Sequence, residues 1–147
     1  MALRVESNMT LAARAGSIFF PQEPQSPEER WISIHEFNVD TGYIYTVLLI
    51  ILSCENLVPP LQSAVNMAVV RVYACLNVIT NQWSTRYEGQ LNGAGPTGRQ
   101  GLPTMIILPL GTGLPLTAGQ GMAASILQAT ATQFRYWAAF LGNSDKT

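Results

Sequence analysis

The chain has 147 residues, a length typical of one domain, and a formal net charge of −1. Charged residues make up 12% of the sequence and hydrophobic residues 48%, so the charged share is about half that of a typical soluble domain. The near-neutral balance excludes strong overall attraction to nucleic acid or to an anionic membrane. A chain with so little charge is expected to cover much of its surface with further copies of itself or with lipid.

The first 25 residues mix small, polar and apolar residues and end in the proline-rich stretch FFPQEPQSP. They hold too little contiguous apolar surface for a core of their own. We therefore expect an extended N-terminal arm over 1–25 and a single domain over 26–147. The first 20 residues lack the uninterrupted apolar core of a secretory signal. The expected location is a virion or an intracellular assembly, reached without a signal peptide.

The segment after the arm begins with a helix start signal. Ser26 is suited to cap a helix, Pro27 to occupy its first position and Glu29 to complete a capping box. These residues predict a helix near 27–37.

The next segment, YIYTVLLIILSC, is apolar on all sides except at Thr46, and two structures compete for it. Either Thr41 caps a buried helix over 43–56, or 31–39 and 43–52 pair as a hairpin across Asp40-Thr41-Gly42. The hairpin at 31–52 gives an α+β alternative. We favour the helix because Asn56 and the two following prolines form a natural end.

Two later segments show helical spacing. Apolar residues from Leu61 to Trp83 recur at intervals of three and four, opposite an amide-rich and nearly uncharged face. The same spacing recurs over 120–141, where Gly142-Asn143 is a natural stop. The fold expected from the sequence is therefore mainly α, with about four helices near 27–37, 43–56, 61–83 and 120–141.

Small and aromatic residues in the last segment predict an oligomer interface. A row of small residues at intervals of four allows a neighbouring helix to approach closely, and an aromatic residue supplies an anchor. The predicted interface residues are Gly121, Ser125, Ala129 and Trp137.

Residues 84–117 contain seven glycines and four prolines, which predicts a long irregular loop. Gly93-x-Gly95-x-x-Gly98 has the spelling of a dinucleotide-binding motif, but the residues before and after it do not form the strand and helix that such a motif needs. We therefore expect no nucleotide cofactor.

Asp40-Thr41-Gly42, set among apolar residues, resembles the active-site triplet of retroviral-type aspartic proteases. That resemblance implies a catalytic role for Asp40, whose carboxylate would pair with a second one. The chain departs from the family at Tyr43, where these proteases usually have alanine, and its predicted helix over 61–83 has no counterpart there. With one histidine, His35, no histidine-based metal cluster can form. We expect no catalytic residue, no metal and no enzyme activity.

Low charge, the amide-rich face and the missing reaction centre favour a self-assembling structural subunit present in many copies, such as a viral or phage-like coat protein or a filament protein. In size and arginine preference the chain resembles coat subunits of helical plant viruses. Arg71, Arg86 and Arg99 are the candidate contacts with nucleic acid. The alternative is a membrane-associated protein with a helical hairpin over 43–80, and the aspartic protease is the third hypothesis.

Overall fold

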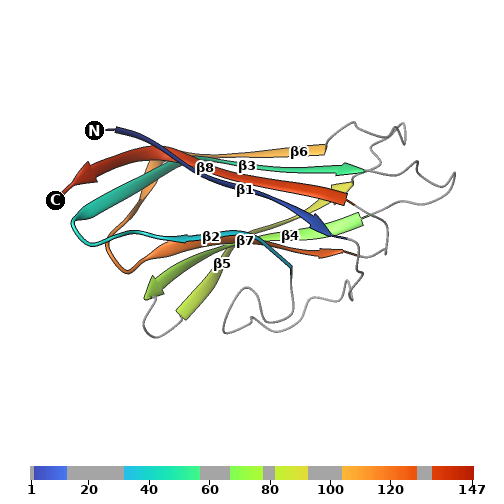
Figure 1. Cartoon of the computed structure of the whole chain (residues 1–147), viewed down its shortest axis with the longest axis horizontal. Coiled ribbons are helices and arrows are strands. Elements are labelled where there is room, and N and C mark those ends of the chain that lie inside the picture. Colours follow the sequence, from blue (N-terminus) through green and yellow to red (C-terminus); the bar gives the residue numbers. More distant parts are fainter. Residues whose placement is uncertain (1, 13–31, 57–66, 78–81, 93–103, 129–133) are drawn as a thin grey trace, which may run out of the picture.

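The computed structural model describes residues 2–12, 32–56, 67–77, 82–92, 104–128 and 134–147, and nearly all of them lie in β-strands (Figure 1). The strands are β1 Ala2–Ala12, β2 Ile32–Asn38, β3 Tyr43–Asn56, β4 Met67–Asn77, β5 Gln82–Asn92, β6 Thr104–Leu116, β7 Gly121–Gln128 and β8 Phe134–Lys146. No described residue is helical. The predicted mainly α fold is therefore wrong, and the described residues contain no helix that could cross a membrane.

The strands form two antiparallel sheets that lie one above the other (Figure 1). The first sheet has the order β1-β8-β3-β6 and the second the order β2-β7-β4-β5. Successive strands lie in different sheets, except β4 and β5, which pair with each other. Eight antiparallel strands arranged in this way form a jelly roll, a two-sheet architecture built from Greek keys.

β3 lies inside the first sheet, between β8 and β6, and corresponds to the apolar run that the sequence predicts to be a helix. Its β-branched and aromatic residues favour a strand that is at least partly covered on both faces. The side chains of Tyr45, Val47, Ile50 and Leu52 are buried. The alternation of core-facing and outward-facing residues shifts by one position at Leu48, because a β-bulge interrupts the pairing of β3 with both β6 and β8 there.

The alternative hairpin over 31–52 is wrong in its pairing, although β2 and β3 are strands. β2 pairs with β7 and β3 pairs with β8 and β6, so the chain crosses from one sheet to the other between them. Asp40-Thr41-Gly42 forms the turn at this crossing, where Tyr43 N donates to Asp40 O over 3.2 Å and Gly42 has a φ of 90°. The positive φ explains the glycine.

The two long segments with helical spacing are also strands. The described part of 61–83 contains β4 and the start of β5, and 120–141 contains β7 and part of β8, which lie in different sheets. The physical reason is that an interval of four is even, so residues four apart share a face of a strand as they share a face of a helix. Met122 and Ile126 illustrate this, since they are four residues apart in β7 and therefore lie on one face of it.

The predicted irregular loop over 84–117 contains most of β5 and all of β6. Pro109 and Pro115 lie within β6 itself, paired with Leu49 and Thr46 of β3. Proline is tolerated there because β6 is an edge strand, so one side of its backbone has no neighbouring strand to bond.

Residues 2–12, predicted to be part of an extended arm, form β1 and pair along their whole length with β8. The remainder of the predicted arm, residues 13–25, lies outside the described residues, as do the start of the first predicted helix and the glycine triplet at 93–98.

The hydrophobic core lies between the sheets. Both sheets contribute buried side chains, the largest of which are Tyr45, Tyr136, Phe140, Ile34, Ile50, Leu52, Met122 and Ile126. This burial of one face of each sheet is what stabilises a two-layer β-fold.

Candidate functional site

The first sheet has a second apolar face, on the side away from the core. Paired residues on antiparallel strands point to the same face, so the register defines rows that run across all four strands. One row on the outer side joins Val5, Leu141, Leu49 and Pro109. A second joins Met9, Trp137, Ser53 and Met105, and a third joins Ser7, Ala139, Ile51 and Ile107. We call these three rows the outer face.

The margins of the outer face are the most exposed. On β1, Val5 is 48% exposed and Met9 53%, and Leu3 and Leu11, which flank the three rows on the same side of the strand, are 77% and 69% exposed. On β6, at the opposite edge, Met105 is 50% exposed and Ile107 56%. Exposed apolar side chains gathered on one face of a sheet mark an interaction site in soluble proteins. The outer face is therefore the candidate functional surface.

β1 is inverted relative to the usual pattern of an antiparallel sheet. Such a sheet normally turns apolar residues to the core and polar residues to the solvent. Here the apolar residues point outward, whereas the alternate residues Arg4, Glu6 and Asn8 pair with Gly142, Phe140 and Ala138 on the core side. The exposed apolar row is thus a consequence of the strand's orientation.

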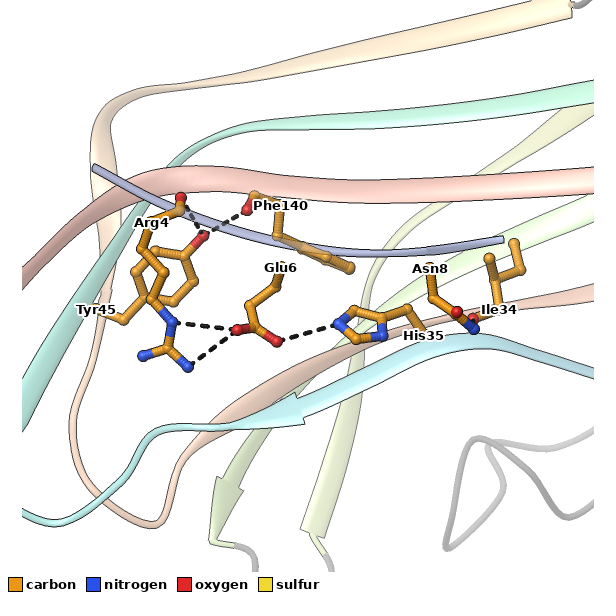
Figure 2. Close-up of polar contacts among 7 residues, drawn as sticks. All are labelled: Arg4, Glu6, Asn8, Ile34, His35, Tyr45 and Phe140. Atoms are coloured by element: carbon orange, nitrogen blue, oxygen red, sulfur yellow. Dashed lines mark hydrogen bonds and ion pairs between the residues drawn. The ribbon is translucent and has the colours of Figure 1, made fainter. Parts of the chain in front are cut away.

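The polar residues of β1 join the edges of the two sheets (Figure 2). The Glu6 carboxylate accepts from Arg4 Nε and Nη2, each at 3.3 Å, and its other oxygen lies 3.2 Å from Nε2 of His35 on β2. Asn8 Nδ2 donates to Ile34 O over 2.7 Å. We call Arg4, Glu6, Asn8 and His35 the polar clasp. It satisfies the polar groups that the inverted strand brings inward.

Aromatic rings support the clasp from the core side (Figure 2). The guanidinium carbon of Arg4 lies 4.6 Å from the centre of the Tyr45 ring and 5.9 Å from that of Phe37, which permits cation–π attraction. The rings of His35 and Phe37 are stacked with centres 6.0 Å apart. The side chains of Arg4, Glu6 and His35 are only 21%, 25% and 18% exposed. The contacts of Glu6 with His35 and of Asn8 with Ile34 O hold β1 against β2.

Tyr45 connects this cluster to the backbone of the first sheet. Its hydroxyl donates to Phe140 O over 2.5 Å and lies 3.3 Å from Arg4 O (Figure 2). Burial raises the pKa of the Tyr45 hydroxyl to about 12, while Arg4 opposes this shift and Glu6 adds to it. The hydroxyl therefore stays protonated at neutral pH. The polar groups of this cluster hold neighbouring strands together, so its role is structural.

Two of the predicted nucleic-acid contacts, Arg71 and Arg86, lie on the neighbouring strands β4 and β5. Arg71 lies in β4, paired with Glu88 and Ser125. Arg86 is exposed on the edge strand β5, at a bulge. Arg99 lies outside the described residues. Contact between these arginines and nucleic acid stays a prediction.

The predicted interface residues that the structure describes lie in two different sheets. Gly121 and Ser125 are buried in β7 of the second sheet, where the Ser125 hydroxyl has no hydrogen-bond partner among the described residues. Ala129 lies outside the described residues. Trp137 is half-buried on the outer face of the first sheet. Of the predicted interface residues that the structure describes, Trp137 lies on the outer face and Gly121 and Ser125 do not.

Asp40, which the protease resemblance made a candidate, is exposed at the turn between β2 and β3. A different signal was present in the sequence and was missed. Leu3, Val5, Met9 and Leu11 alternate with polar residues, which is the period of a strand with one apolar face. The prediction of an extended arm over 1–25 did not take this strand period into account.

A scan against protein-family models finds no match, and a search of curated protein sequences finds none either. Among solved structures, a carbohydrate-binding module from a glycoside hydrolase family 9 protein of Ruminococcus flavefaciens is 7% identical, with a TM-score of 0.42, and the match covers 94% of this chain and 98% of that one.

Two structures of infectious bursal disease virus also match. The Gt strain is 10% identical with a TM-score of 0.33, covering 97% of this chain and 32% of the other. The Gx strain is 11% identical with a TM-score of 0.34, covering 95% and 33%. The chain thus spans about a third of the virus chains it matches. At these TM-scores none of the likenesses carries an argument about function.

Proposed function

We propose that the protein is a self-assembling structural subunit whose copies pack through the outer face, and that the assembly is a coat or shell. The observation that carries the proposal is the exposed apolar surface at both margins of the first sheet, on β1 and β6. Burying this surface between copies would stabilise the assembly by about 25 cal/mol for each Å² of apolar area removed from water. The predicted helical architecture of a filament subunit is not part of the proposal, because the described fold is a β-sandwich.

Two further properties support other copies of the chain as the partner. Charged residues make up only 12% of the sequence, which suits a subunit surrounded by like subunits. The net charge of −1 supplies no attraction to anionic lipid, and the helical hairpin of the membrane hypothesis is replaced by strands in two different sheets. Jelly rolls are used in viral capsids, in lectins and in cupins, so the fold is compatible with a coat but does not decide it.

The proposal predicts that charge on the outer face disperses the assembly. The double variant Val5→Glu/Ile107→Glu places one carboxylate on each exposed margin, at side chains that are 48% and 56% exposed. Both carboxylates face solvent in the monomer, so folding should be retained, whereas burial in an interface requires their desolvation. Sedimentation velocity should show a multi-copy species for the native chain and predominantly monomers for the variant.

The matched control is Thr41→Glu/Thr117→Glu, which adds the same charge at exposed turn positions away from the outer face. It should sediment like the native chain. Circular dichroism should give the same β-rich spectrum for all three proteins. A double variant that assembles as well as the control would show that the outer face is not the interface.

A further inference from the structure

The four sheet edges differ in how well they are protected from pairing with another strand. β6 contains Pro109 and Pro115 within the strand. β5 has two register shifts against β4, and β2 has 7 residues and one shift against β7. Prolines, bulges, short strands and inward-pointing charges are the usual devices that prevent edge-to-edge association. β1 has no proline, no bulge and full length, and its inward-pointing charges, Arg4 and Glu6, contact each other and His35 within the subunit.

β1 is an edge strand of 11 residues without proline, glycine or bulge. All of its residues, from Ala2 to Ala12, pair with β8 in one unbroken register. Its other edge has no neighbouring strand among the described residues. A long, regular and apolar edge of this kind is a template for another strand.

We propose that β1 of a second copy pairs antiparallel with β1, so that the first sheets of two subunits form one continuous sheet. This inference rests on the proposed function and specifies one contact within the assembly. An antiparallel pair of identical strands has two-fold symmetry, and such interfaces are self-complementary. A second copy of the chain therefore offers the same open β1 edge, so each copy can pair with the other through this edge.

The bounds of β1 define the register that pairs the whole strand. Full overlap of Ala2–Ala12 with its copy places Ser7 on the two-fold axis, opposite Ser7 of the second copy. Val5 then lies opposite Met9 of the second copy, and Leu3 opposite Leu11. Because opposed residues share a face, both exposed apolar rows join on the outer side of the continuous sheet.

The charged residues are compatible with this register. On the core side Glu6 lies opposite Asn8 of the second copy, and Arg4 lies opposite Thr10. Like charges directly opposite each other would destabilise the pair of strands, and this register opposes none. Within each subunit, Arg4 and Glu6 already contact each other and Glu6 contacts His35, so the polar clasp holds β1 in place and its outer edge is the part left for the second copy.

Disulfide cross-linking tests both the contact and the register. Residues directly opposed in antiparallel strands have Cα atoms about 4.5–5.5 Å apart, within the range of about 4.4–6.8 Å that a disulfide spans. Ser7 is exposed, so the Ser7→Cys variant should form a covalent dimer on mild oxidation. Thr41→Cys, at the exposed turn between β2 and β3 and away from the outer face, is the matched control. The native chain gives the baseline from its own cysteines.

We expect a covalent dimer for Ser7→Cys, seen on non-reducing gels and lost on reduction, and only the baseline for Thr41→Cys. Equal cross-linking of both variants, or of neither, in protein that still assembles would overturn the β1 contact and leave the proposed function standing. A native chain that is monomeric by sedimentation contradicts both.

Discussion

Replacing Phe140 with alanine is expected to lower the free energy of unfolding by about 3–5 kcal/mol, the usual cost of removing a fully buried phenylalanine. Phe140 is 0% exposed, and its ring lies 5.1 Å from the ring of Phe37 and 6.2 Å from that of His35, measured between centres. The side chain therefore packs against both sheets, and alanine would leave a cavity between them. Against a total stability of about 5–15 kcal/mol for a typical domain, this loss is large.

Phe140→Leu is the control for this variant. Leucine keeps most of the apolar volume, so its cost should be clearly smaller than that of alanine. Urea unfolding of all three proteins at one fixed concentration measures the differences, since assembly would make stability depend on concentration. If alanine and leucine had equal and small effects, Phe140 would not lie in the packed core.

Gly142→Ala is expected to cost about 1–3 kcal/mol or more, as overpacking of a closely packed site does. Gly142 pairs with Val47 at the bulge in β3. A Cβ atom added at Gly142 would lie 2.8 Å from the carbonyl carbon of Thr46 and 3.0 Å from Cα of Val47, and closer still to Thr46 O. These are backbone atoms, so the strand itself must move to admit the methyl group.

Gly119→Ala separates this collision from the effect of backbone conformation. Gly119 has a φ of 83° and no atom within 4 Å of an added Cβ, so alanine there costs only the strain of a left-handed conformation, roughly 1 kcal/mol. Thermal unfolding should show a larger loss for Gly142→Ala. A loss no larger than that of Gly119→Ala would mean that β3 and β8 do not approach closely at this point.

The fold was not predictable from periodicity alone, and β3 shows why. A run that is apolar on all sides fits a buried helix and a central strand equally well, and neither period is visible in it. The prediction of a helix rested on the end signals at Asn56 and the two following prolines. In β7, residues four apart remain on one face in either structure, so Met122 and Ile126 were placed on a common face correctly and in the wrong element.

The candidate surface was predictable in part. Low charge predicted a surface covered by further copies or by lipid, which stays a prediction, and the structure shows exposed apolar residues on β1 and β6. Trp137 lies on that surface, whereas Ser125 is buried in the other sheet. The strand period from Leu3 to Leu11 was readable, but its outward direction was not, because it depends on the contacts of Glu6 with His35 on a distant strand.

Assembly of many copies of the chain through the first sheet can be seen by negative-stain electron microscopy of the purified native protein, beside the Val5→Glu/Ile107→Glu variant. We expect regular multi-subunit particles for the native chain and none for the variant. Dispersed single molecules in both samples, at concentrations where the protein is folded, would contradict it.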